Sequence, residues 1–71
     1  MKNIPIDTEF IKLGQLLKLA GATSSGVESK IFITEGLVKV NGDVETRRGK
    51  KLYDGDVVEF ENESYKVIQN D

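Results

Sequence analysis

The sequence contains no cysteine, histidine or tryptophan and only one proline. Without cysteine, neither a disulfide nor a thiolate zinc site can stabilise the fold. Without histidine, the chain lacks the commonest general base of enzymes and the commonest metal ligand in proteins. We therefore expect no metal, no cofactor and no catalysis, and a fold that apolar side chains hold together unaided.

Long apolar runs are also missing. None reaches the roughly 18 residues that a membrane-spanning helix requires, and the first residues lack the apolar core of a secretory signal. We expect a cytoplasmic protein with neither a membrane partner nor a small-molecule substrate. Its 71 residues suit a single domain that covers residues 1–71, and we expect a monomer.

The net charge of −2 conceals a segregation of charge along the chain. Residues 39–51 carry five basic and two acidic side chains, whereas residues 52–71 carry one basic and six acidic side chains. The remaining residues, 1–38, are balanced. Because the local distribution of charge decides nucleic-acid binding, the acidic total does not exclude an RNA or DNA partner.

Apolar periodicity predicts two short helices. Leu13, Leu16, Leu17 and Ala20 follow the spacing of an amphipathic helix over residues 11–20. Gly14 within this helix costs about 1 kcal/mol relative to alanine. Glycine 21 stands where a left-handed cap would end the helix.

A second helix is predicted over residues 26–35. Ser25 and Glu28 match a capping box at its start, and Gly36 marks its end. The two helices, joined by a small polar loop, would form an αα-hairpin. The residues of the second helix that we expect to be buried are Val27, Ile31, Phe32 and Ile33.

From residue 37 the apolar period changes from 3.6 to 2, which indicates strands. Asn41-Gly42 is a strong hairpin signal, because a type I′ turn needs positive φ at both central residues. Pro5 restricts a short strand within residues 3–10 to a sheet edge. Further strands are predicted over residues 38–40, 44–46, 57–61 and 64–68, with turns at 54–56 and 62–63. The fold class is α+β: a two-helix hairpin packed on a small, mainly antiparallel sheet of about four to five short strands.

A basic loop follows the predicted hairpin. Arg47, Arg48, Lys50 and Lys51 surround Gly49, which lets the backbone approach a partner closely. Arginine can grip a phosphate with two hydrogen bonds, and lysine adds a compact charge. The alternative is a solvated loop whose charges serve only solubility. No aromatic residue interleaves this cluster, so base stacking is not supported.

Two other features have weaker functional interpretations. Ser24, Ser25 and Gly26 lead into a helix N-terminus, which is either an ordinary cap or, beside basic residues, a phosphate seat. The acidic residues 54–63 lack the spacing of a calcium loop and suit a solvated face. The aromatic residues Phe10, Phe32, Tyr53, Phe60 and Tyr65 are assigned to the core.

Three segments resemble the alpha-L RNA-binding motif, the domain named after ribosomal small-subunit protein S-four. They are KLGQLLK (residues 12–18), SGVESK (residues 25–30) and EGLVKVNG (residues 35–42). The continuation ETRRGKKL (residues 45–52) followed by DGDVV (residues 54–58) is most similar to the small stand-alone YaaA/YbcJ-like members. The resemblance covers roughly residues 10–60, and the combination of a helical pair with V-x-V-N-G is more specific than either part.

The resemblance implies a basic face, formed by the helices and the hairpin loop, that binds structured RNA, ribosomal RNA above all. Gly14 and Gly26 stand where the family often has an aspartate and a basic residue. The RNA-binding residues that we predict from the resemblance and the charge pattern are Lys12, Lys18, Ser25, Lys30, Lys39, Asn41, Arg47, Arg48, Lys50 and Lys51.

The resulting hypothesis is a non-catalytic domain that binds structured RNA or a ribosomal particle, with a role in ribosome assembly or maturation. The alternative is a protein-interaction adaptor that docks a protein partner through the acidic strand face and the basic loop. An enzyme is disfavoured, because no serine has a base nearby and no glycine-rich nucleotide loop is present.

Overall fold

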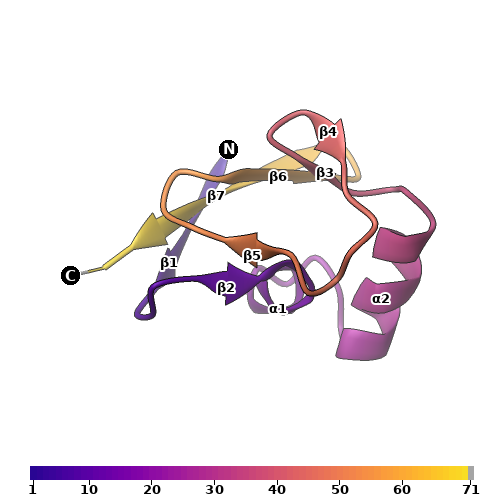
Figure 1. Ribbon diagram of the computed structural model, residues 1–71, viewed down its shortest axis with the longest axis horizontal. Coiled ribbons are helices and arrows are strands. Elements are labelled where there is room, and N and C mark those ends of the chain that lie inside the picture. The colour runs from indigo at the N-terminus through magenta and orange to yellow at the C-terminus, as the bar shows by residue number, and fades with distance from the viewer. Residues whose placement is uncertain (71) are drawn as a thin grey trace.

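The computed structural model describes residues 1–70 and contains two helices and seven strands within that range (Figure 1). In chain order the elements are β1 (Lys2–Ile6), β2 (Ile11–Lys12), α1 (Leu13–Leu19), α2 (Gly26–Thr34), β3 (Lys39–Val40), β4 (Asp43–Val44), β5 (Lys51–Leu52), β6 (Val57–Phe60) and β7 (Glu63–Gln69). The α+β class with its helical hairpin is confirmed.

A five-stranded sheet in the order β1-β7-β6-β3-β4 forms one layer of the molecule. Three of its pairings are antiparallel, and β1 pairs with β7 in parallel, so the mainly antiparallel prediction is confirmed. The strand β1 lies at the edge of the sheet, as Pro5 predicts, because proline has no N–H to give to a second neighbour. Figure 1 shows both helices on one side of this sheet.

A two-stranded ribbon of β2 and β5 is the main element that the sequence patterns missed. Ile11 pairs with Leu52, and Lys12 pairs with Lys51. The first helix therefore begins at Leu13, and the expectation of helix from residue 11 was wrong. The physical reason is tertiary: residues 11 and 12 pair with a segment about 40 positions further along the chain, a partner that local periodicity cannot reveal.

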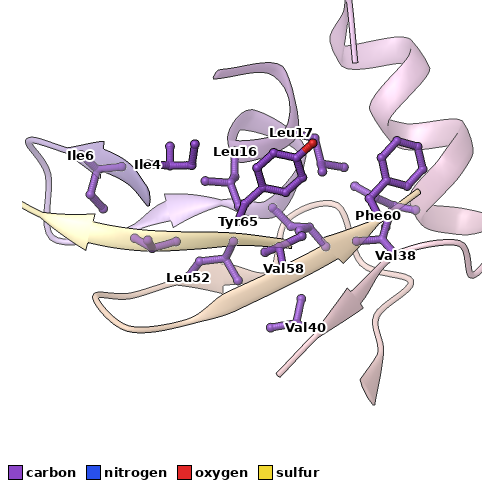
Figure 2. Close-up of a cluster of buried hydrophobic side chains, with 13 residues drawn as sticks. Ile4, Ile6, Leu16, Leu17, Val38, Val40, Leu52, Val58, Phe60 and Tyr65 are labelled. Carbon is purple, nitrogen blue, oxygen red and sulfur yellow. The ribbon is translucent and has the colours of Figure 1, made fainter. Parts of the chain in front are cut away.

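The core lies between the five-stranded sheet on one side and α1 with the ribbon on the other (Figure 2). Leu13, Leu16 and Leu17 of α1 are fully buried, in agreement with the predicted stripe. Figure 2 shows Leu16 and Leu17 next to Tyr65 of the sheet within this cluster. Burial of a leucine side chain contributes roughly 1.5–3 kcal/mol, so this short helix is held by packing far more than by its own propensity.

The second helix buries less than predicted. Ile33 is fully buried and Phe32 is half-buried, but Val27 is 71% exposed and Ile31 is 49% exposed. The expectation that all four are buried was wrong for Val27 and Ile31. The reason is that α2 meets the core along a narrow strip centred on Ser29 and Ile33, which leaves the opposite side of the helix to solvent.

The predicted helix ends are correct in position. Gly21 and Gly36 have φ of 76° and 78°, the left-handed conformation that ends a helix. Ser25 caps α2, since its side chain accepts a hydrogen bond from the Glu28 N–H at 3.1 Å. The Glu28 carboxylate bonds to the N–H and hydroxyl of Ser24 instead of returning to Ser25.

Two tight turns connect neighbouring strands of the sheet. Asn41 (φ 51°) and Gly42 (φ 89°) join β3 to β4, as predicted. Glu61 (φ 52°) and Asn62 (φ 65°) join β6 to β7, one residue earlier than predicted. The shift arises because Phe60 pairs with Glu63, which makes residues 61 and 62 the two central positions of the turn.

Candidate nucleic-acid interface

The basic loop between β4 and β5 is attached to the fold at both ends. At its start, the Glu45 N–H donates to the Val38 carbonyl at 3.0 Å. At its end, the Arg48 and Lys50 carbonyls accept hydrogen bonds from the N–H groups of Gly14 (3.0 Å) and Leu13 (2.9 Å). The loop therefore satisfies two main-chain donors at the start of α1, which helix geometry leaves without intrahelical partners.

This attachment brings the loop beside both helices and creates a hollow of about 330 Å³, which we call the first hollow. Three cationic side chains reach it from three segments of the chain: Lys12, Lys18 and Arg48. The full lining consists of Lys12, Gly14, Gln15, Lys18, Gly26, Arg48 and Gly49. Among residues 1–70, no acidic side chain lines it, so positive potential is concentrated where the surface is concave.

A second hollow, of about 510 Å³, also borders the loop. It is lined by Arg47, Gly49, Lys50, Lys51 and Tyr53. Gly49 belongs to both hollows, so the two depressions adjoin at the loop. The prediction from sequence treated the loop as one cluster, whereas the structure divides its cations between two depressions.

Lys12 and Lys51 connect the two hollows. They are directly opposed in the β2–β5 ribbon, and residues in that position project from the same face. Like charges in such a pair destabilise a sheet. Neither lysine forms an ion pair among residues 1–70, and the Lys51 ammonium lies over the Phe10 ring instead.

Arg47 differs from its neighbours because it is already paired. Its Nε and Nη2 atoms donate to the two carboxylate oxygens of Glu45 at 2.9 and 3.0 Å. The same carboxylate also accepts from the Arg47 main-chain N–H at 3.0 Å. These hydrogen bonds lower the pKa of Glu45 to about 2 and raise the pKa of Arg47. Part of the positive charge of Arg47 is therefore balanced inside the loop.

Two predicted contacts on α2 lie at the margin of the first hollow. Ser25 precedes Gly26, but its hydroxyl is engaged as the helix cap. Lys30 stands one helical turn after Gly26, on the same side of α2, and is exposed. Lys30 therefore extends the basic surface along the helix.

Lys39 and Asn41 are not brought into either hollow. Val38 and Val40 point into the core, so Lys39 between them projects from the opposite face of the sheet, beside Glu59. The Asn41 amide is used by the fold: its Nδ2 donates to Asp56 at 3.1 Å and its Oδ1 accepts from the Val57 N–H at 3.0 Å. The sequence pattern that singled out Asn41 is that of a tight turn, and Asn41 is a central residue of the turn between β3 and β4.

Two aromatic residues lie beside the basic loop, not in the core. Tyr53 is 45% exposed, and its ring centroid is 6.0 Å from that of Phe10. The Lys51 Nζ lies 4.8 Å from the centre of the Phe10 ring, a cation–π contact. The assignment of these two residues to the core was therefore wrong, whereas Phe60 and Tyr65 are buried as predicted.

Gly14, Gln15, Gly26 and Tyr53 line the hollows but are not among the RNA-binding residues predicted from sequence. The sequence offered Gly26 only as part of a possible phosphate seat, and Gly14 only as a helix cost and a departure from the family pattern. Their gathering depends on hydrogen bonds between residues more than 30 positions apart, such as that from Gly14 to Arg48, so no local signal reveals it. Tyr53 could have been suspected from its place two residues after Lys51.

Within residues 1–70, no group of three or more acidic, histidine or cysteine side chains is arranged to hold a metal ion. In the same part of the chain, neither helix has the length and apolar character needed to cross a bilayer.

Comparison with known proteins identifies the family of this chain. Residues 4–68 match the model of the S4 domain. The chain is 53% identical to the "Probable ribosome maturation protein RlbA" of Bacillus subtilis over 66 residues, which cover 92% of this chain and 93% of the relative. It is 47% identical to the "Putative RNA-binding protein YbcJ" of Escherichia coli over 58 residues, which cover 82% of this chain and 83% of that protein.

Solved structures resemble the fold as well. The solution structure of E. coli YbcJ, described as revealing an alpha-L motif involved in RNA binding, superposes with a TM-score of 0.73 at 40% identity and covers 96% of this chain and 87% of YbcJ. The 30S ribosomal protein S4e of Thermoplasma acidophilum gives a TM-score of 0.68 at 28% identity. That match covers 92% of this chain but only 34% of S4e.

Proposed function

The chain belongs to the S4 domain family, and from this premise we propose that it binds structured RNA, in particular ribosomal RNA, through the two hollows beside the basic loop. The observation that carries the proposal is the convergence of Lys12, Lys18 and Arg48 on a hollow that no acidic side chain of residues 1–70 lines. Such a surface suits the phosphate oxygens of a nucleic acid.

The position of Lys12 opposite Lys51 supports the same conclusion. Neither lysine is held by an acidic side chain among residues 1–70, so both can contact a phosphate. Since α1 begins directly after Lys12, the domain holds this pair at a rigid junction and not on a mobile tail. The positive charge is thus preorganised before a partner arrives.

We infer structured RNA because both hollows are lined by charge and main chain more than by stacking platforms. Arg48 lines the first hollow and Lys50 lines the second, so the loop can contact two stretches of sugar–phosphate backbone. Duplex RNA is recognised mostly by its shape and by contacts to phosphates and 2′-hydroxyls. Contacts of that kind position a protein without reading much sequence.

We propose a role without catalysis. Lysine, arginine, glutamine and glycine line the first hollow, and no carboxylate of residues 1–70 lines it to act as a general base. The name of the Bacillus subtilis relative points to ribosome maturation, and we propose the same role for this chain. We expect it to act as a monomer in the cytoplasm, where ribosomal particles mature.

The experiment is quantitative binding of the purified protein to ribosomal RNA extracted from ribosomal subunits, measured over a series of salt concentrations. A variant with alanine at Arg47, Arg48, Lys50 and Lys51 should fold normally and bind much more weakly. The slope of log affinity against log salt should fall by about 0.7–0.9 for each phosphate contact that is lost. Unchanged affinity in this variant would refute the assignment of the site.

The adaptor alternative predicts a different outcome. Capture of partners from a bacterial extract, with and without ribonuclease, separates the two functions. Loss of ribosomal particles after ribonuclease treatment supports RNA binding. Protein partners that survive the digestion and include no ribosomal component would instead favour the adaptor.

A further inference from the structure

The seven glycines of the chain fall into two groups. Four have positive φ, between 76° and 91°, and are explained by the turns and helix ends where they stand. These four are Gly21, Gly36, Gly42 and Gly55. The other three are Gly14, Gly26 and Gly49, and all three line the first hollow.

The fold itself does not require glycine at these three positions. A Cβ atom added to Gly26 or Gly49 would meet no atom within 4 Å. At Gly14 it would lie 3.6 Å from the Arg48 carbonyl oxygen, an ordinary van der Waals contact. Glycine also loses more conformational freedom on folding than any other residue. Alanine at Gly26 or Gly49 should therefore preserve or raise the stability of the domain.

We propose that Gly14, Gly26 and Gly49 keep the first hollow open so that the sugar–phosphate backbone of one RNA strand can lie directly against the protein main chain. Lys12, Lys18 and Arg48 flank the three glycines and would contact the phosphates of that strand. The inference rests on the proposed function and assigns a ligand, the backbone of a single strand, to one of its two hollows.

Close approach of the RNA strand allows main-chain groups of the protein to bind its phosphates. The N–H groups of Arg47 and Lys50 already donate to Glu45 and to the Arg47 carbonyl. With no side chain on Gly49, the N–H groups of Arg48 and Gly49 can approach a phosphate oxygen, as in other anion-binding loops. A side chain at Gly49 or Gly26 would hold the strand away and lengthen the distance to all three flanking cations. Charge would remain on the surface, but its contacts with the phosphates would be lost.

The test uses four variants of the complete chain: Gly26→Ala, Gly49→Ala, Gly26→Leu and Gly49→Leu. Ribosomal RNA extracted from ribosomal subunits is the probe, and thermal unfolding is measured in parallel. Each alanine variant should bind about 5-fold more weakly, and each leucine variant at least about 30-fold more weakly, with a reduced salt slope. Unfolding temperatures should be unchanged or higher, which separates loss of binding from loss of fold.

Gly55→Ala is the matched control. Gly55 has φ of 91° and lines neither hollow, so alanine there should lower the unfolding temperature and leave the RNA affinity of the folded protein within about 2-fold. The inference is overturned if the leucine variants bind like the unmodified chain while alanine at Lys12, Lys18 and Arg48 weakens binding. In that case the proposed function survives. Absence of RNA binding by the unmodified chain would refute both.

Discussion

The acidic turn of residues 53–56 and the basic loop of residues 47–51 differ in how far their charged side chains are bonded within the fold. In the acidic turn, the Asp54 carboxylate accepts from the Gln69 N–H at 2.8 Å, and the Asp56 carboxylate accepts from the Tyr53 N–H at 2.8 Å and from the Asn41 amide. In the basic loop, the single ion pair found among residues 1–70 holds Arg47, and the other cations have no such partner.

This difference distinguishes charges that serve the fold from charges that the fold leaves free. The aspartates satisfy main-chain donors where three segments meet, so their substitution should lower the free energy of unfolding. Apart from the contact of Lys51 with the Phe10 ring, the unpaired cations gather around the two hollows without a side-chain partner among residues 1–70. Substitution of these cations should lower the affinity for an anionic partner. The following predictions test whether the two regions separate in this way.

The largest effect is expected from removing the cations of the first hollow. The triple variant Lys12→Ala, Lys18→Ala, Arg48→Ala should lose about 100-fold in affinity for ribosomal RNA near physiological salt, with a salt slope lower by about 2–3. Its free energy of unfolding should change by less than about 0.5 kcal/mol, because exposed cations contribute little to stability. Filter binding and denaturant unfolding measure the two quantities. A large loss of stability would contradict the separation of the two regions.

The converse variant removes an acid that the fold uses. Asp56→Ala deletes the acceptor of two hydrogen bonds, from Tyr53 and Asn41, and should cost about 1–2 kcal/mol of unfolding free energy. The RNA affinity of the folded protein should stay within about 2-fold, because Asp56 lines neither hollow. A strong fall in RNA affinity would show that the acidic turn belongs to the interface after all.

The pair of Glu45 and Arg47 is the one place where both kinds of charge meet. The pKa of Glu45 should be about 2, because Arg47 donates hydrogen bonds to its carboxylate, and Arg47→Ala should return it toward 4.5. A carboxyl whose folded pKa is lowered stabilises the fold fully above its unfolded pKa and loses that contribution as the pH falls from about 4.5 to about 2. Titration of the Glu45 side-chain carbon by NMR measures the shift. A pKa near 4.5 in the unmodified chain would show that the pair does not persist in solution.

The smallest effect is expected at Lys39. This side chain lies beside Glu59 on the face of the sheet opposite the core, away from both hollows. Lys39→Ala should therefore change RNA affinity by less than about 2-fold and leave the salt slope unaltered. A loss comparable to that of the first-hollow variant would extend the binding surface around the hairpin and bring Lys39 back into the interface.

Most local features could be predicted because their causes are local. The turn at residues 41–42 depends on two residues that accept positive φ, and the start of α2 depends on Ser25 and its own first turn. The buried leucines of α1 follow from helical spacing alone. The predictions failed where the outcome depended on contact with a distant segment. The burial of Val27 and Ile31 depended on which strip of α2 faces the core.

The amino-acid sequence by itself determined the class of fold, the turns and the concentration of positive charge in residues 47–51, because these depend on the composition and spacing of nearby residues. Only the tertiary structure decided which charges act together. Hydrogen bonds from Gly14 and Leu13 to the loop carbonyls draw residues 48 and 50 to the start of α1, and the pairing of β2 with β5 sets Lys12 opposite Lys51. The hollows exist because segments far apart in the chain satisfy one another's main-chain groups.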